Sequence, residues 1–219
     1  MTLKASKNKP LSGTARVPGD KSISHRAIMF GSLAVGETTV TGLLEGEDVL
    51  STAEAMRAMG AEITRGNDGI WRIHGLGTAG VRGPSEVLDM GNSGTSTRLL
   101  MGLLAGLPIT ATFTGDASLV KRPMRRVMTP LEMMGAKFMA RQNDKLPLTM
   151  QGAERALPIE YRLPVASAQV KSAILLAGLN ADGATTVIED TPTRDHSENM
   201  FRHFGLTVDV ADIENGAQA

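Results

Sequence analysis

The 219-residue chain contains no cysteine, which excludes disulfide bonds, thiolate metal ligands and cysteine nucleophiles together. Aromatic residues make up only 3% of the sequence although hydrophobic residues reach 42%, so a core must be built from Leu, Val, Ile, Ala and the 13 methionines. Lys plus Arg and Asp plus Glu are equal at 23 each, so no overall charge draws the chain to nucleic acid or to an anionic membrane. Any anion site must come from local arrangement.

Long apolar runs are also missing. The longest spans residues 99–109 and is far shorter than the ~20 residues that a membrane-spanning helix requires. The basic opening, MTLKASKNKP, has no apolar segment behind it and does not resemble a secretory signal. We therefore expect a soluble cytoplasmic protein without nucleic-acid or membrane partners.

The sequence does contain a repeat of about seventy residues. Three helix-period segments each end in a glycine, at Gly60, Gly135 and Gly205, and each is followed by a β-rich run. Glycine adopts the left-handed conformation at low cost, so all three are predicted helix caps. Each unit is predicted to run helix, strand, helix, strand, turn and return strand, with turns at residues 65–69 and 141–145 in the first two copies.

The third copy is expected to be incomplete. Its last strand is predicted at residues 206–210 and the following turn near residues 214–216, which leaves no sequence for a return strand. A sheet edge this bare is unusual in a finished domain. The sequence therefore predicts a fragment or a truncated chain.

The Ala-rich helices of the three repeats begin alike, within DKSISHR, GNSGTSTR and VASAQVK. Each start carries a serine followed by a cation, and the pairs are Ser22 with Arg26, Ser93 with Arg98, and Ser167 with Lys171. One interpretation is that the serines are only N-caps. The other is that three helix N-termini, with their unpaired N–H donors and nearby cations, hold phosphate or carboxylate groups on one face. The sequence leaves both interpretations open.

Other polar stretches are less specific. GDKS is not a nucleotide-binding P-loop, because the G-x-x-x-x-G-K-[ST] spacing is missing. The basic run at residues 121–126 is either a solvated face or an arginine grip for an anion. The histidines lack metal-ligand spacing, and surface or capping roles are expected for His25, His74, His196 and His203.

Six motifs, in order, resemble the 5-enolpyruvylshikimate-3-phosphate synthases, especially the class of glyphosate-tolerant bacterial enzymes. They are PGDKSISHR, LLEGEDV, GNSGT, GDASLVKRPM, ASAQVKSAILLAGLN and TRDHSE. The resemblance runs from about residue 11 to the end and matches the N-terminal half of such an enzyme. It implies an α/β fold, an inside-out barrel domain of three βαβαββ-type repeats. It also implies residues 1–13 as a segment that belongs with an absent second domain, and residues 14–219 as the three-repeat domain, with repeats at about 14–84, 85–158 and 159–219.

The resemblance further implies a function. The family transfers the enolpyruvyl group of phosphoenolpyruvate to the 5-hydroxyl of shikimate 3-phosphate, in the shikimate pathway to aromatic amino acids, and needs no organic cofactor or metal. Both substrates are phosphorylated carboxylates. The isolated 219-residue chain is expected to be inactive, because the family's active site lies between two domains.

Site residues follow from the matching motifs. Lys21 resembles the family lysine that meets phosphoenolpyruvate and takes part in proton transfer, and we expect neighbouring cations to depress its pKa. The residues that resemble shikimate 3-phosphate contacts are Lys21, Ser22, Arg26, Ser167, Ala168, Gln169 and Arg194. Those that resemble contacts to phosphoenolpyruvate or glyphosate are Lys21, Gly94, Arg122 and Gln169. Arg98 and Lys171 are expected to add charge to the same face, and Asp48 and Asn92 are weaker candidates.

Two alternatives remain open. The sister family transfers enolpyruvyl to UDP-N-acetylglucosamine, but it usually carries a reactive cysteine and a GAKN-type opening, both of which are missing here. The other alternative is a non-catalytic anion-binding module. Tolerant relatives carry alanine where this chain has Gly94, so an enzyme completed from this chain is expected to be sensitive to glyphosate.

Overall fold

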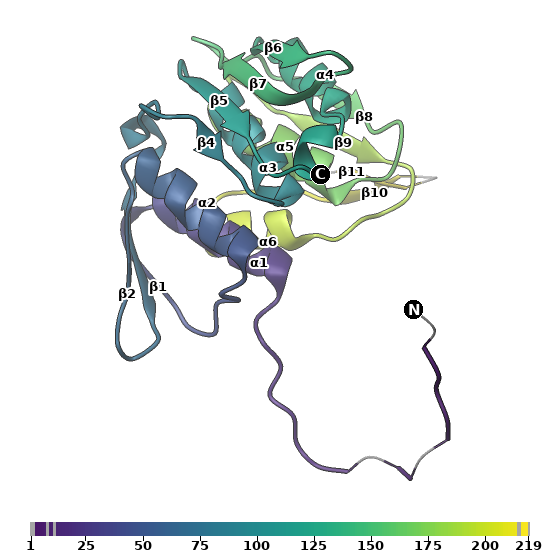
Figure 1. Ribbon diagram of the computed structural model, residues 1–219. Coiled ribbons are helices and arrows are strands. Elements are labelled where there is room, and N and C mark those ends of the chain that lie inside the picture. Colours follow the sequence, from purple (N-terminus) through teal and green to yellow (C-terminus); the bar gives the residue numbers. More distant parts are fainter. Residues whose placement is uncertain (1–2, 8, 11, 214–215, 219) are drawn as a thin grey trace.

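The computed structural model describes residues 3–7, 9–10, 12–213 and 216–218. The described residues before Lys21 form neither helix nor strand, and they lead away from the body of the molecule (Figure 1). Their assignment to a second domain stays a prediction. Among the described residues, no helix is both long and apolar enough to cross a membrane.

Three repeats of one plan follow. The first contains α1 (Lys21–Leu33), β1 (Val35–Val40), α2 (Glu47–Ala58), β2 (Glu62–Arg65) and β3 (Trp71–Leu76), followed by the short helix η1 (Thr78–Gly80). The second contains β4 (Leu88–Asp89), α3 (Gly94–Ala105), β5 (Thr110–Thr114), η2 (Leu119–Lys121), α4 (Arg125–Met133), β6 (Lys137–Arg141) and β7 (Lys145–Gln151). The third contains β8 (Glu160–Arg162), α5 (Ala168–Gly178), β9 (Thr186–Glu189), α6 (His196–His203), β10 (Ala211–Ile213) and β11 (Gly216–Gln218).

Each repeat builds its own sheet. The orders are β1-β3-β2, β4-β5-β7-β6 and β10-β11-β9-β8. In the second and third sheets the first strand pairs in parallel with the second, and the remaining pairs are antiparallel. The predicted βαβαββ unit is therefore confirmed in the second and third repeats. In the first repeat, residues 14–20 form no strand, so that sheet has three strands instead of four.

The predicted glycine caps are confirmed. Gly60, Gly135 and Gly205 have φ values of 104°, 105° and 84°, in the left-handed region that favours glycine. The predicted turn at residues 141–145 places Asn143 and Asp144 at φ 62° and 56°, and short polar side chains tolerate this conformation. Local sequence chemistry thus sets the ends of these elements.

The prediction about the end of the third repeat was wrong. Residues 206–210 form no strand, and the strand β10 lies at Ala211–Ile213 instead. A short return strand, β11, pairs antiparallel with both β10 and β9. The predicted turn near residues 214–216 falls mainly on residues 214 and 215, which lie outside the described residues. A strand of three residues is too short to show the alternating pattern by which a strand is recognised in a sequence.

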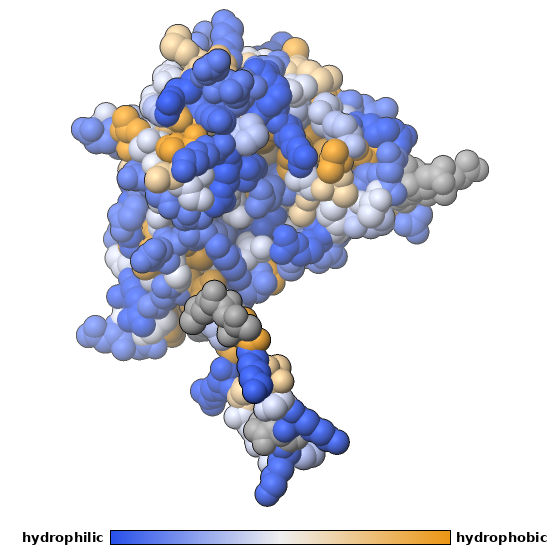
Figure 2. Space-filling view, turned by 45° about the vertical axis from the view of Figure 1, so that its right-hand side comes forward, coloured by the Kyte–Doolittle hydropathy of each residue, from blue (hydrophilic) through white to orange (hydrophobic). Residues whose placement is uncertain are grey.

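The core lies among the helices, and the aliphatic and methionine-rich composition predicted for it is confirmed. Helix α3 is buried at ten of its positions and packs against α5. The two helices approach closely at Gly102, where a Cβ atom would lie 2.5 Å from Ala173 Cα and 2.3 Å from its carbonyl oxygen. Figure 1 shows α3 and α5 surrounded by strands, as an inside-out arrangement requires, and the face of the molecule seen in Figure 2 is largely hydrophilic.

Candidate functional site

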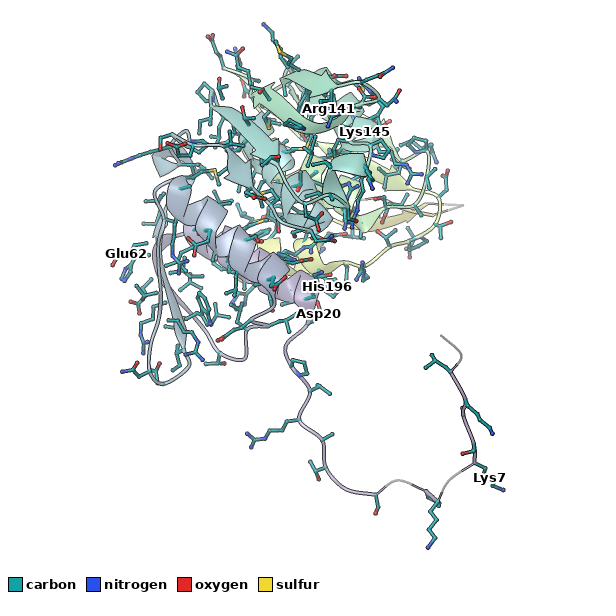
Figure 3. The ribbon with its side chains drawn as sticks, in the orientation of Figure 1. Lys7, Asp20, Glu62, Arg141, Lys145 and His196 are labelled. Atoms are coloured by element: carbon teal, nitrogen blue, oxygen red, sulfur yellow. The ribbon has the colours of Figure 1, made fainter. Side chains whose placement is uncertain are left out.

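The N-terminal ends of α1, α3 and α5 are linked by side-chain hydrogen bonds. Gln169, in the first turn of α5, donates from Nε2 to Thr95 Oγ1 of α3 at 2.9 Å. Arg194, just before α6, donates to Ser22 Oγ of α1 at 3.3 Å. Figure 3 shows Asp20 and His196 near one another, where α1 and α6 begin. Arg26 of α1 also donates to Ser172 Oγ of α5 at 2.6 Å, so the three helices whose starts the sequence singled out are connected in one region.

The cap interpretation holds for two of the three serines. Ser93 and Ser167 are N-caps, each accepting a hydrogen bond from a backbone N–H of the helix it begins. In α1 the cap is Asp20, whose Oδ1 accepts from the backbone N–H of Ile23 at 2.8 Å. Ser22 as a cap was wrong. Its hydroxyl lies inside the first turn, where it is free to accept from Arg194.

Four predicted shikimate 3-phosphate contacts line one open pocket. Ser167, Ala168 and Gln169 form the α5 wall, and Arg194 with its neighbour Thr193 forms the opposite wall. The Arg194 side chain is exposed and carries the positive charge of the pocket. Donors from a helix N-terminus facing an exposed guanidinium are an arrangement suited to an anion.

A second cationic group lies at the start of α3. Arg98 Nη1 donates to the Gly94 carbonyl at 3.0 Å and to Gln169 Oε1 at 3.1 Å. Arg122 Nη2 donates to Asn92 Oδ1 at 2.8 Å. Burial lowers the pKa of Arg98, and the positive charge of Arg122 lowers it further. Gly94, Arg122 and Gln169, which the resemblance assigns to phosphoenolpyruvate, are thus grouped, and Arg98 joins them.

Lys21 begins α1 and is about half exposed, with 52% of its side chain accessible. Its Nζ forms an ion pair with the carboxylate of Asp48, on α2. Neighbouring cations were expected at this position instead. The exposed half of the amine leaves it open to a ligand, while Asp48 fixes its position.

Arg26 is buried at 3% exposure, beneath the region that the other predicted residues occupy. Its Nε donates to Ser197 Oγ at 2.8 Å and its Nη2 to Ser172 Oγ at 2.6 Å. Ser172 in turn donates to the Ala168 carbonyl at 2.6 Å. Burial lowers the pKa of Arg26 to about 10. The guanidinium ties α1 to α5 and α6, and a direct substrate contact by Arg26 stays a prediction.

Two expectations about buried polar residues were wrong. His25 has no exposed surface, so it is neither a surface nor a capping residue. Lys171 is 2% exposed and lies between the carboxylates of Glu189 and Glu198, so it does not add charge to the site face. The apolar positions around both residues are a signal that could have indicated burial, since Ile28 and Ile174 each lie one helical turn further on. Among the described residues, no group of three His, Asp or Glu could hold a metal ion.

Comparison with known proteins agrees with this arrangement. Residues 5–218 match the family model of EPSP synthase (3-phosphoshikimate 1-carboxyvinyltransferase). The chain is 71% identical over 206 residues to the 3-phosphoshikimate 1-carboxyvinyltransferase of Novosphingobium aromaticivorans, covering 93% of this chain and 47% of that protein. It is 64% identical over 215 residues to the protein of the same name from Parvibaculum lavamentivorans, covering 98% of this chain and 48% of that protein.

A solved structure gives the same result. EPSP synthase from Acinetobacter baumannii superposes with a TM-score of 0.87 at 51% identity, over 94% of this chain and 46% of that one. The chain therefore spans about half the length of the curated relatives that it matches.

Proposed function

Because the chain belongs to the EPSP synthase family, we propose that it supplies one of the two substrate-binding halves of an enolpyruvyl transferase. The proposed reaction joins the enolpyruvyl group of phosphoenolpyruvate to the 5-hydroxyl of shikimate 3-phosphate and releases phosphate. The proposed location is the cytoplasm. The proposed partner is the C-terminal half, which corresponds to the remainder of the relatives' length.

One observation carries this proposal: the four pocket residues matched to shikimate 3-phosphate adjoin the group matched to phosphoenolpyruvate. Gln169 belongs to both, because it lines the pocket beside Arg194 and accepts from Arg98. Two anions bound there would lie next to each other. A transfer between two substrates requires that proximity.

The charges at the site suit two phosphorylated carboxylates. Arg194 and Arg122 present guanidinium groups, which grip carboxylate and phosphate with two parallel hydrogen bonds. The first turns of α3 and α5 add backbone donors and the positive ends of their helix dipoles. Cations grouped in this way also reduce the repulsion between the two bound anions.

The proposed chemistry needs a proton donor and acceptor. Addition of the 5-hydroxyl to C2 of phosphoenolpyruvate places a proton on its methylene carbon, and elimination removes a proton there as phosphate leaves. Lys21 is proposed for a proton transfer, since its amine is accessible and is held in place by Asp48. The C–O bond to phosphate breaks in the second step, and Arg122 is proposed to stabilise the departing charge.

Calorimetry on the purified chain tests the proposal. Shikimate 3-phosphate, UDP-N-acetylglucosamine and inorganic phosphate are titrated separately, and binding of the first alone is expected. Arg194→Ala should weaken that binding by roughly tenfold or more, the effect of removing one charged hydrogen-bond donor. Arg155→Ala is the matched control, because Arg155 is an exposed arginine that pairs with Asp182, and neither residue lines the pocket or belongs to the segment that carries Arg194.

Each alternative predicts a different result. Preferential binding of the UDP-sugar would indicate the sister family's activity. Equal binding of inorganic phosphate and shikimate 3-phosphate would indicate a general anion-binding module. Either result would contradict the proposed function.

A further inference from the structure

Three ionic side chains are buried together behind the candidate site. Lys171 Nζ lies 2.7 Å from Glu189 Oε2 and 2.6 Å from Glu198 Oε1. All three residues are at most 3% exposed. Burying charged groups is costly even when they are paired, and apolar side chains of similar volume often fill such a space with equal or greater stability. The cluster therefore calls for an explanation other than stability.

The cluster connects three elements around the pocket. Lys171 lies on α5, two positions after Gln169. Glu189 is the last residue of β9, and Glu198 lies in the first turn of α6. The segment between β9 and α6, residues 190–195, carries Arg194. The cluster thus spans both walls of the pocket without lining it.

The contact that reaches the pocket wall comes from Glu189. This carboxylate accepts hydrogen bonds from the Thr193 hydroxyl and, at 3.3 Å, from the Thr193 backbone N–H. Thr193 directly precedes Arg194. Both donors therefore fix the backbone from which the Arg194 side chain extends.

The far end of the segment is also held. Ser197, next to Glu198, accepts from Arg26 and donates to Ser172 of α5 at 2.7 Å. The segment that carries Arg194 is thus held at Thr193 on one side and at the start of α6 on the other. The Arg194 side chain itself is exposed, and its hydrogen bond to Ser22 is long, at 3.3 Å. The position of the Arg194 guanidinium therefore depends mainly on the backbone of residues 190–195.

We propose that the Lys171–Glu189–Glu198 cluster, acting through Thr193, positions Arg194 to bind the anion of the substrate. Lys171 is then a positioning residue. It holds the Glu189 carboxylate in the orientation that accepts both hydrogen bonds from Thr193. This inference rests on the proposed function for the identity of the anion, but the positioning of residues 190–195 is independent of any ligand.

Thr193→Val is the most informative variant. It removes the hydroxyl donor with little change of shape and leaves the three charges paired. Lys171→Met, by contrast, would leave two carboxylates buried without a cation and could prevent folding. Thr193→Ser restores the hydroxyl. Thr112→Val is the matched control, because Thr112 is a part-buried threonine bonded to Thr149 at 2.9 Å, in a different sheet.

Two measurements on the purified 219-residue chain are combined. Hydrogen exchange of residues 190–195 without ligand should become faster in Thr193→Val by roughly tenfold or more, the ratio expected from losing one hydrogen bond to a charged carboxylate. It should stay unchanged in Thr193→Ser and Thr112→Val. Affinity for shikimate 3-phosphate, measured by calorimetry, should fall by a similar factor in Thr193→Val.

A double-mutant cycle separates positioning from general stability. In the Arg194→Ala background, Thr193→Val should cause no further loss of affinity, because its effect passes through Arg194. An equal loss in both backgrounds would overturn the proposal, and so would unchanged exchange of residues 190–195 in Thr193→Val. If the unsubstituted chain binds no shikimate 3-phosphate, the proposed function fails, and the exchange comparison still decides the positioning.

Discussion

Acidification from pH 7 to pH 5 should destabilise the fold through His25. This side chain is fully buried between α1, α2 and α3. Its Nδ1 lies 2.7 Å from Thr52 Oγ1 and 3.2 Å from Ser96 Oγ. Its Nε2 has no hydrogen-bond partner among the described residues. These surroundings therefore suit a neutral imidazole, because a charged one would have a second N–H donor, at Nε2, without an acceptor in the part of the chain that the structure describes.

Burial lowers the pKa of His25 from 6.5 to about 4, against the opposing effect of the Asp48 carboxylate. The positive charges of Lys21 and Arg26 make smaller contributions to this decrease. Above pH 6.5 both the folded and the unfolded chain hold this imidazole neutral, so it adds no pH dependence there. Below pH 6.5 the unfolded chain binds a proton that the folded chain rejects, so stability falls until the pH reaches about 4.

The size of the effect follows from the two pKa values. Each unit of difference corresponds to about 1.4 kcal/mol, so the loss of unfolding free energy is roughly 2 kcal/mol at pH 5 and roughly 3 kcal/mol at pH 4. Carboxylates with lowered pKa, such as Asp68 at about 2, lose their stabilising charge mainly below this range. The interval from pH 7 to pH 5 therefore isolates the histidine contribution.

Urea unfolding measures this loss. The single tryptophan, Trp71, is buried at 4% exposure, so its fluorescence reports the transition. The control is His25→Asn, which keeps a hydrogen-bonding group near Thr52 and Ser96 but cannot titrate. The variant is expected to have a lower free energy of unfolding at pH 7. It should lose less of that free energy between pH 7 and pH 5. Parallel pH dependence in the two proteins would refute the reasoning.

Three further predictions concern the proposed activity, measured by phosphate release with a separately expressed C-terminal half. Lys21→Met should abolish turnover while unfolding stays cooperative, because it removes an accessible amine from the first turn of α1; near-normal turnover would contradict its role. Gly94→Ala should weaken inhibition by glyphosate more than it weakens binding of phosphoenolpyruvate. The new methyl would lie 2.8 Å from Arg98 Nη1 and 3.2 Å from Arg122 Nη1 and must displace them. An unchanged inhibition constant would argue against this crowding. The chain without its partner half should release no phosphate, because the proposed partner half supplies the other wall of the site, and substantial release would contradict the two-halves proposal.

Features set by neighbouring residues were predictable from the sequence. The caps at Gly60, Gly135 and Gly205 follow from the conformational freedom of glycine at the end of an apolar periodic run. The helix starts at Ser93 and Ser167 follow from cap chemistry. At α1 the same chemistry misled, because Asp20 and Ser22 are both competent caps and the path of the incoming chain decides between them.

Features set by distant residues were not predictable in this way. Lys171 meets carboxylates 18 and 27 positions further along the chain, and no local pattern shows that these three will converge. Arg26 reaches Ser197 across 171 positions, and its burial depends on that contact. The candidate site was located from its motifs, whereas the buried polar groups beneath it became visible only in three dimensions.

The close contact at Gly102 fixes the distance between α3 and α5, the two helices whose first turns form part of the candidate site. Gly102 lies about two turns from Gly94 along α3, and Ala173 about one turn from Gln169 along α5. A side chain at Gly102 would push α3 and α5 apart. Because both helices are rigid, the distance between their N-terminal ends would also increase, where Arg98 donates to Gln169. Substitutions that change which anions fit together can therefore arise where no ligand ever reaches.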